Sequence, residues 1–413
     1  MSDNFQTDNG AISSSDYQKL QQIILETIDQ QSQTLINISR TIHADPEIAY
    51  QEHRAAATLA QTLEENGFVV ERNTAQIETA FLAHTGDAAA PNIAICAEYD
   101  ALPGLGHGCG HNLIATSALG AALALRQVID QLPGRISIYG TPAEEGGGGK
   151  VLLVNRGAFK GVDAAIMFHP SSHNMSNRGS LAATRVNVAF RGRASHAAAA
   201  PDKGINALDG IIQTFNNINA LRQHLREDAR VMGIITNGGS AANIVPDYAS
   251  GHFSIRAEDR RYTDEVLAKF RRCAEAAALS TGATLEFTVL ENSRYDNMVP
   301  NPTLARLFDQ KMQLLGLEVS LSDGGERMGS TDMGNVSQVV PSIHSYLAIA
   351  PTSVSGHTIE FREAAYSDEG QRGMLNAAKA MALTTLDLLA RPELLAQAKR
   401  EFQEQTSKGV VKG

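Results

Sequence analysis

The chain has 413 residues, of which 43% are hydrophobic and 19% charged, and its formal net charge is -10. This length exceeds one ordinary hydrophobic core, so we expect two domains. An acidic chain argues against nucleic acid as a partner, because phosphate binding requires a basic surface.

The cysteines and the distribution of apolar residues predict the compartment. Cys96, Cys109 and Cys273 form an odd, sparse set, unlike a disulfide framework. The N-terminal segment MSDNFQTDNGAISSS is polar and lacks the apolar core of a signal peptide. No run of about 18 apolar residues predicts a membrane span. We therefore expect a cytoplasmic protein without a membrane partner.

Strand-like and helix-like segments alternate in the first part of the chain. Such alternation indicates an α/β fold with a largely parallel sheet, in which ligands bind beyond the carboxyl ends of the strands. Residues 1–14 are polar and expected to be disordered. Helices are expected over 16–42, 52–66 (ended by Gly67), 113–130 and 151–156, and strands over 68–71, 80–84, 92–97, 135–140 and 164–168.

The pattern changes near Leu181. The order strand, helix, strand, strand, helix, strand is that of a ferredoxin-like α+β unit. We therefore expect a separate domain at 183–291, inserted into a domain made of 1–182 and 292–413. The inserted segments are 184–191, 205–225, 231–236, 249–257, 263–280 and 284–290.

The remaining segments return to the first domain. They are helices over 302–315 and 367–389, strands over 319–321 and 343–349, a loop that holds His357, and a weakly structured tail over 407–413.

Side chains that bind metal ions recur after the predicted strands. The segment Gly106–Asn112, GHGCGHN, places two imidazoles and a thiol between three glycines. Singly, each candidate could be an exposed loop residue or half of a solvated pair, but recurrence at strand ends favours one site. Thiolate, imidazole and carboxylate are ligands of zinc and related ions. The candidate ligands are Cys109, His111, Glu145, His169 and His357.

Eight segments, in order, resemble the dinuclear metallopeptidase family of aminoacylases and glutamate carboxypeptidases. The likeness spans about residues 43–370. The Cys-Gly-His form is similar to the amidohydrolase subgroup, with its aminobenzoyl-glutamate, hippurate and auxin-conjugate hydrolases and its dipeptidases of basic amino acids. The segments are HADPEIAYQEHRAA (43–56), YDALPGLGHGCGHN (99–112), TPAEE (141–145), FHP (168–170), RGRASHAAAAPDKGINALDGI (191–211), NIVPDYASGHFSIRA (243–257), GSTDMG (329–334) and SGHTIEF (355–361).

The resemblance implies a catalytic α/β domain whose inserted domain is a lid that mediates homodimerisation. It implies that the five candidate ligands hold two zinc or manganese ions. Glu144 would be the general base and Asp100 would orient a ligand. His196 would polarise the substrate carbonyl, from its own or the partner subunit. Asn243 and Arg256 match positions that hold the substrate.

The expected reaction is hydrolysis of the amide bond of an N-acyl amino acid or a dipeptide with a free carboxylate, which Arg256 could bind. Metal-activated water would attack, with Glu144 as base. Asn112 and Gly-Ser-Thr-Asp (329–332) replace the subgroup's usual Asp and Ser-Glu-Asp, and both fit the dipeptidase-like branch. The alternatives are a di-zinc aminopeptidase, which needs an acidic group for a free amine, and a non-catalytic metal-binding protein, against which the Glu144–Glu145 pair argues.

Overall fold

The computed structural model describes residues 12–320 and 328–409. These residues form two compact units. The first unit comprises 12–179, 298–320 and 335–409, and the second comprises 180–297 and 328–334. Among the described residues, no helix combines the length and the apolar character needed to cross a membrane.

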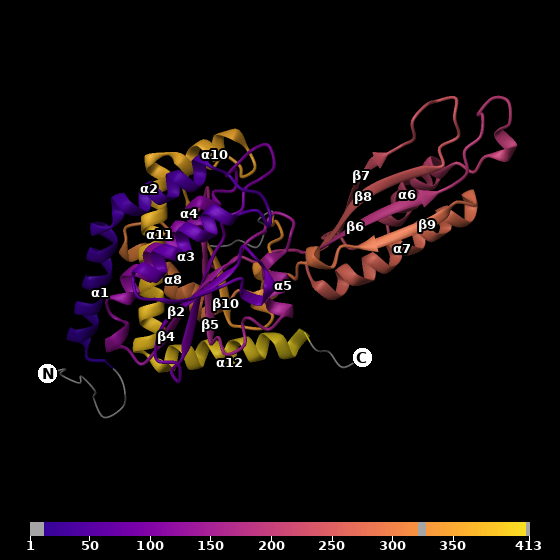
Figure 1. Ribbon diagram of the computed structural model, residues 1–413. Coiled ribbons are helices and arrows are strands. Elements are labelled where there is room, and N and C mark those ends of the chain that lie inside the picture. The colour runs from indigo at the N-terminus through magenta and orange to yellow at the C-terminus, as the bar shows by residue number, and fades with distance from the viewer. Residues whose placement is uncertain (1–11, 321–327, 410–413) are drawn as a thin grey trace. The chain divides into compact units, whose positions relative to one another are not determined.

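The first unit is built on a six-stranded sheet with the order β1-β2-β4-β3-β5-β10 (Figure 1). β3 is parallel to β4 and β5, and β5 is parallel to β10, whereas β2 is antiparallel to both of its neighbours. The predicted mixed, mostly parallel sheet is therefore confirmed. The strands are β1 Val69–Arg72, β2 Phe81–Gly86, β3 Asn92–Ala97, β4 Arg135–Gly140, β5 Ala164–Ser171 and β10 Ser342–Ala348.

Strand β3 is central to this sheet. Every residue from Ile93 to Ala97 is buried, as expected for a parallel strand covered on both faces. The chain passes from β3 to β4 on one side and then from β4 to β5 on the other side of β3. The strand order thus reverses at β3, and the edge beyond the carboxyl ends of these strands is where open α/β sheets bind ligands.

Helix α4, His111–Arg126, is buried from His111 through Leu125. It contacts β3, β4 and β5 as well as the helices α1, α2, α3 and α11. A helix enclosed in this way needs small or apolar residues on all sides. At Gly120, for example, a Cβ atom would lie 3.0 Å from the Leu35 side chain.

Two expectations about helices are wrong. The helix expected over 16–42 is two helices, α1 Ser14–Gln30 and α2 Ser32–Ala44, because the backbone leaves the helical conformation at Gln31. Buried residues keep their helical spacing across this break, from Ile28 to Leu35, so the pattern carries no sign of it. The tail is helical through Gly409 as part of α12.

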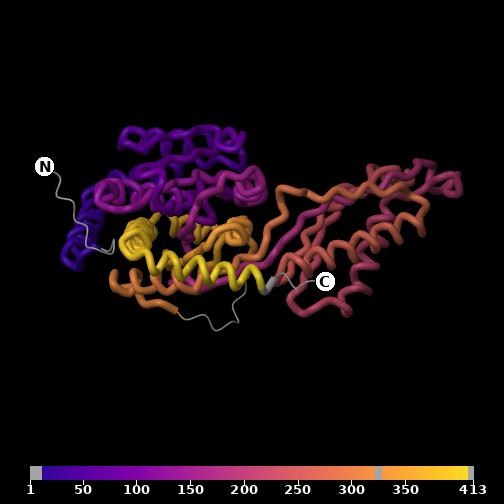
Figure 2. The backbone as a smooth tube through the Cα atoms, turned by 90° about the horizontal axis from the view of Figure 1, so that it is seen from below, coloured from indigo at the N-terminus to yellow at the C-terminus, as the bar shows by residue number. Residues whose placement is uncertain are grey.

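Other expectations differ in detail. Residues 319–320 are not in a strand, and Leu321, residues 1–11 and residues 410–413 lie outside the described part of the chain. Three helices were not expected: α9, α10 and α12. Figure 2 shows α12 beside α8, where Thr303 donates to Glu401 over 2.8 Å. The other helices of this unit are α3 His53–Glu65, α5 Gly149–Asn155, α8 Pro302–Leu314, α9 Met333–Ser337 (which begins in the second unit), α10 Ile359–Tyr366, α11 Asp368–Ala390 and α12 Pro392–Gly409.

The second unit is a four-stranded antiparallel sheet, β7-β8-β6-β9, that packs against two helices. Its elements follow the predicted order of strands and helices. They are β6 Ala182–Arg191, α6 Ala207–Arg222, β7 Arg230–Asn237, β8 Tyr248–Ala257, α7 Arg260–Thr281 and β9 Thr284–Val289.

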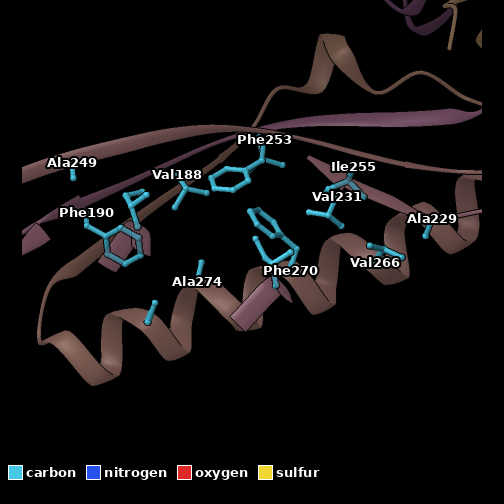
Figure 3. Packing of buried hydrophobic residues seen from close by; sticks show 14 of the residues in the cluster. Val188, Phe190, Ala229, Val231, Ala249, Phe253, Ile255, Val266, Phe270 and Ala274 are labelled. Atoms are coloured by element: carbon cyan, nitrogen blue, oxygen red, sulfur yellow. The ribbon is translucent and has the colours of Figure 1, made fainter. Parts of the chain in front are cut away.

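Aromatic rings form the centre of the core of the second unit (Figure 3). The Phe253 ring centroid lies 5.0 Å from that of Phe215 and 4.9 Å from that of Phe270. A Cβ atom at Gly233 would lie 2.3 Å from the Phe253 ring, so the neighbouring strand leaves space for it. Phe253 therefore joins β8 to both helices.

Replacing Phe253 with Ala should lower the free energy of unfolding by about 3–5 kcal/mol, because the cavity cannot close around a missing ring. Urea unfolding followed by circular dichroism measures this. The control Leu279→Ala, at a side chain on α7 that is 88% exposed, should stay within about 0.5 kcal/mol of the wild type. A loss below about 1 kcal/mol for Phe253→Ala would contradict this account of the core.

Candidate metal centre

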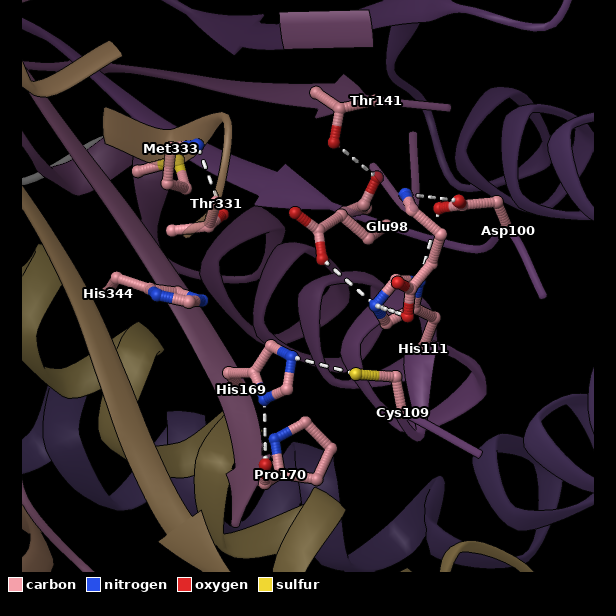
Figure 4. Close-up of polar contacts among 12 residues, drawn as sticks. Glu98, Asp100, Cys109, His111, Thr141, His169, Pro170, Thr331, Met333 and His344 are labelled. Carbon is pink, nitrogen blue, oxygen red and sulfur yellow. Dashed lines mark hydrogen bonds and ion pairs between the residues drawn. The ribbon is translucent and has the colours of Figure 1, made fainter. Parts of the chain in front are cut away.

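The five predicted ligands converge in the first unit, at or beyond the carboxyl ends of β3, β4 and β5 (Figure 4). Within each of three groups, the potential ligand atoms lie within 4.8 Å of one another. Because Cys109 and His111 each belong to two groups, the donors form one continuous cluster. The groups are Cys109, His111 and His169; Cys109, Glu145 and His357; and His111, Glu144 and Glu145.

The glycine-rich loop before α4 positions the thiol. Gly106 and Gly110 have φ angles of 76° and 73°, a left-handed conformation that glycine adopts without strain. At Gly110, a Cβ atom would also lie 2.8 Å from the Pro170 ring. Cys109 Sγ thereby lies 3.6 Å from His169 Nε2 and 3.4 Å from His357 Nε2.

Hydrogen bonds fix which ring nitrogen of two histidines faces the cluster. His111 Nδ1 donates to Asp100 Oδ1 over 3.1 Å, and His169 Nδ1 donates to the Pro170 carbonyl over 2.7 Å. In each ring the other nitrogen, Nε2, therefore faces the donors and can offer an electron pair. His111 Nε2 and Glu145 Oε1 are buried, and neither has a hydrogen-bond partner among the described residues.

Asp100 joins two parts of the cluster. Its Oδ1 accepts from His111, and its Oδ2 accepts from the Glu145 backbone N–H over 2.9 Å. Burial alone would raise the pKa of this carboxyl, but the charge and hydrogen bond of His111, with the backbone N–H groups, hold the pKa below its usual value. An ionised carboxylate thus orients both His111 and the strand-end loop that carries Glu145.

The electrostatics of the cluster suit a divalent cation. Burial, aided by the charge of His111, lowers the pKa of His169 to about 3, so its imidazole is neutral. Burial and the charge of Glu145 raise the pKa of the Cys109 thiol above its ordinary value, and a nearby cation would reverse this effect. Buried polar atoms without partners are rare in folded proteins. A cation would satisfy those of His111 and Glu145, so these residues fit a metal ion.

Two residues beside the donors have left-handed backbones although neither is glycine. Ala143, which precedes Glu144, has a φ of 62°, and His357 has a φ of 64°. Such strained conformations persist only where surrounding contacts enforce them, and they concentrate at functional sites. Glu144 itself is only 9% exposed and belongs to one of the three donor groups.

The other three predicted site residues belong to the second unit. His196 and Asn243 are exposed neighbours there, since the Ala197 N–H donates to the Asn243 carbonyl over 3.0 Å. His196 Nδ1 accepts from the Ala199 N–H over 3.1 Å, which leaves Nε2 to carry the proton of the neutral ring. Arg256 lies in β8, opposite residues of β6 and β7.

Sequence reasoning missed two residues of the centre, Glu98 and Lys150. They form a fully buried ion pair, and Glu98 Oε2 lies 3.5 Å from His111 Nε2. The sequence held a signal for Glu98, which follows β3 directly and precedes Asp100 by two residues. Lys150 gave none, because its position after four glycines does not predict burial.

Asn112, which departs from the subgroup pattern, has a role in packing. Its side-chain N–H2 donates to Ser39 Oγ over 3.0 Å and to the Ala365 carbonyl over 3.2 Å. The amide thereby joins α4 to α2 and α10. Aspartate could only accept hydrogen bonds there. The asparagine therefore has a structural cause that is independent of any substrate.

Comparisons with known proteins agree with this geometry. The model of the peptidase family M20/M25/M40 matches residues 94–372. The Xaa-Arg dipeptidase of Mus musculus is 39% identical over 410 residues, which cover 95% of this chain and 94% of that protein. One of the chains of the p-aminobenzoyl-glutamate hydrolase of Escherichia coli (strain K12) is 31% identical over 468 residues, covering 94% and 96%.

Solved structures show the same fold. A dinuclear metal binding peptidase of the M20 family from Bacillus subtilis has a TM-score of 0.65 and 22% identity, covering 87% of this chain and 99% of its own. The aminobenzoyl-glutamate utilization protein from Klebsiella pneumoniae has a TM-score of 0.70 and 21% identity, covering 89% and 98%.

Asn112→Asp should lower the free energy of unfolding by about 2–3 kcal/mol at pH 8, because a buried carboxylate would face oxygen atoms that cannot donate. The loss should shrink as the pH falls, since a protonated carboxyl can donate one bond. Urea unfolding at several pH values measures this. Asn66→Asp, at an exposed amide that donates to the Thr62 carbonyl, is the control and should change little. Equal stability of Asn112→Asp and wild type at every pH would contradict the packing role.

Proposed function

The chain belongs to the peptidase family M20/M25/M40 and is a hydrolase, and on this premise we propose that it cleaves the amide bond of an N-acyl amino acid or a dipeptide with a free C-terminal carboxylate. The observation that carries this proposal is the convergence of thiol, imidazole and carboxylate donors with Glu144 at the end of the sheet. The named activities of the dipeptidase and hydrolase relatives support the substrate class.

The five donors would hold two divalent ions, zinc or manganese. When bound, such ions lower the pKa of a coordinated water from about 16 toward about 7, which supplies a nucleophile at neutral pH. Asp100 would keep the proton of His111 on Nδ1, so that Nε2 stays available as a ligand. The buried Lys150–Glu98 pair would keep a second carboxylate ionised behind the centre.

Glu144 would act as the general base. Its carboxylate would take a proton from the attacking water and later return it to the nitrogen of the leaving amine. General acid–base catalysis of this kind contributes about 100- to 10,000-fold. The adjacent ties of Ala143 and Glu145 support this role, because they hold the backbone on both sides of Glu144.

The second unit would bind the substrate. We assign to it the proposed domain 183–291, a lid that also mediates homodimerisation. His196 would donate from Nε2 to the oxygen of the tetrahedral intermediate. Arg256 would pair with the substrate carboxylate through two parallel hydrogen bonds, and Asn243 would hold the substrate backbone.

An exposed edge of the second unit supports a dimer. Strand β7 lies at the edge of its sheet, where backbone groups can pair with another chain. Met232 and Ile234 of this strand are 43% and 63% exposed, although both are apolar. We also propose the reducing cytoplasm as the compartment, since all three cysteines are free thiols.

Glu144→Gln should lower kcat by at least about 1,000-fold, because the amide cannot accept the proton. Metal content, measured by mass spectrometry, should not change. Turnover should be followed on N-acyl amino acids, dipeptides and their C-terminal amides, of which the amides should react poorly. Glu26→Gln, an exposed substitution on α1, is the matched control. Near-normal turnover by Glu144→Gln would remove Glu144 from the mechanism.

His196→Ala should lower turnover by about 100- to 1,000-fold, as expected for loss of one oxyanion donor, with metal content unchanged. Mixing inactive His196→Ala with inactive Glu144→Gln tests whether the site is shared between subunits. After subunit exchange, about a quarter of wild-type turnover should return, because half of the dimers are mixed and each has one complete site. Exchange shown by tagging without any recovery would contradict a shared site.

A further inference from the structure

Glu52 occupies an unusual position for an acidic residue. It is fully buried and immediately precedes α3, yet its side chain does not cap that helix. Glu47 supplies the cap instead, since its Oε2 accepts from the backbone N–H groups of Arg54 and Ala55 over 2.9 and 3.0 Å. The usual role of a carboxylate at a helix N-terminus is therefore already filled.

The Glu52 carboxylate turns toward the loop that carries the proposed base. Its Oε1 accepts from the Ala143 N–H over 2.9 Å and from the Tyr50 N–H over 3.0 Å. Ala143 is the residue before Glu144, and its left-handed backbone requires a contact that enforces it. The bond from Glu52 reaches the peptide group that enters this conformation.

The same segment holds the loop at a second point. Tyr50 Oη donates to the Gly147 carbonyl over 2.6 Å. A Cβ atom at Gly147 would lie 2.6 Å from both the Tyr50 ring and the Ala143 side chain, so only glycine allows this approach. Together with the bond from the Glu145 N–H to Asp100, these contacts fix the loop on both sides of Glu144.

Keeping Glu52 at this position is costly. Burial, together with the charge of nearby Asp100, raises the pKa of Glu52 to about 7. A carboxyl group is retained in the interior when its hydrogen bonds serve a specific geometry or a function. The contacts of Glu52 with Ala143 and Tyr50 identify the geometry it serves.

We propose that Glu52 is a positioning residue for the hydrolytic reaction, which holds Ala143 in its left-handed conformation and thereby aims the Glu144 carboxylate. This inference rests on the proposed role of Glu144. Glu52 itself does not touch substrate or metal. Its effect should appear in kcat, because an error of about 1 Å in the placement of a catalytic group can cost about 100-fold in rate.

Three variants of the full-length, metal-loaded enzyme test this. Glu52→Ala should lower kcat by about 10- to 100-fold with KM and metal content unchanged. Glu52→Gln should stay within about threefold of wild type, because its amide oxygen still accepts both hydrogen bonds. The matched control Glu47→Ala removes a buried cap from the same segment and should lower the urea midpoint without changing kcat. A wild-type kcat for folded Glu52→Ala, or a Glu52→Gln as slow as Glu52→Ala, would overturn the inference.

A second pair of variants covers misfolding and tests the cause. Adding Ala143→Gly to Glu52→Ala should restore kcat by about tenfold, because glycine adopts a positive φ without the Glu52 contact. Should Glu52→Ala fail to fold, Tyr50→Phe probes the same loop and should lower kcat by about 3- to 10-fold at constant KM. No rescue by glycine, or an unchanged kcat in Tyr50→Phe, would overturn the inference.

The two proposals can fail separately. Active Glu144→Gln would overturn the proposed function, whereas inactive Glu144→Gln beside fully active Glu52→Ala would overturn only the positioning role.

Discussion

The bond between Asp100 and His111 is the interaction on which the rest of the centre depends. One carboxylate at the end of β3 orients the first residue of α4 and anchors the backbone of the loop after β4. These three elements are consecutive in the chain but enter the site from different directions. A parallel sheet brings them together because its carboxyl ends share one edge.

Local patterns were sufficient for the sheet and for most of the donor cluster. Apolar runs predicted β3 and β4 with the bounds that the structure has, since a strand buried on both faces leaves a continuous apolar segment. Polar residues directly after such strands then identified Asp100, Glu144 and Glu145. The structure brings them to within reach of Cys109 and His111. Their catalytic and ligand roles remain proposals.

Features that depend on tertiary contacts left no local signal. The turn at Gln31 preserves helical spacing, so it cannot be read from periodicity. Asn112 was interpreted as a clue to substrate, but its amide lies between α2 and α10 and serves packing. Glu52 belongs to a segment chosen for its resemblance alone, and its importance appears only through the distant Ala143 N–H.

The buried pair of Glu98 and Lys150 also has an evolutionary consequence. Replacing either partner alone leaves one charge uncompensated inside the protein, which is far more damaging than replacing both by uncharged residues. Selection therefore acts on the two positions as one inherited character. Among homologues, they should change together or not at all, although they lie 52 positions apart in the sequence.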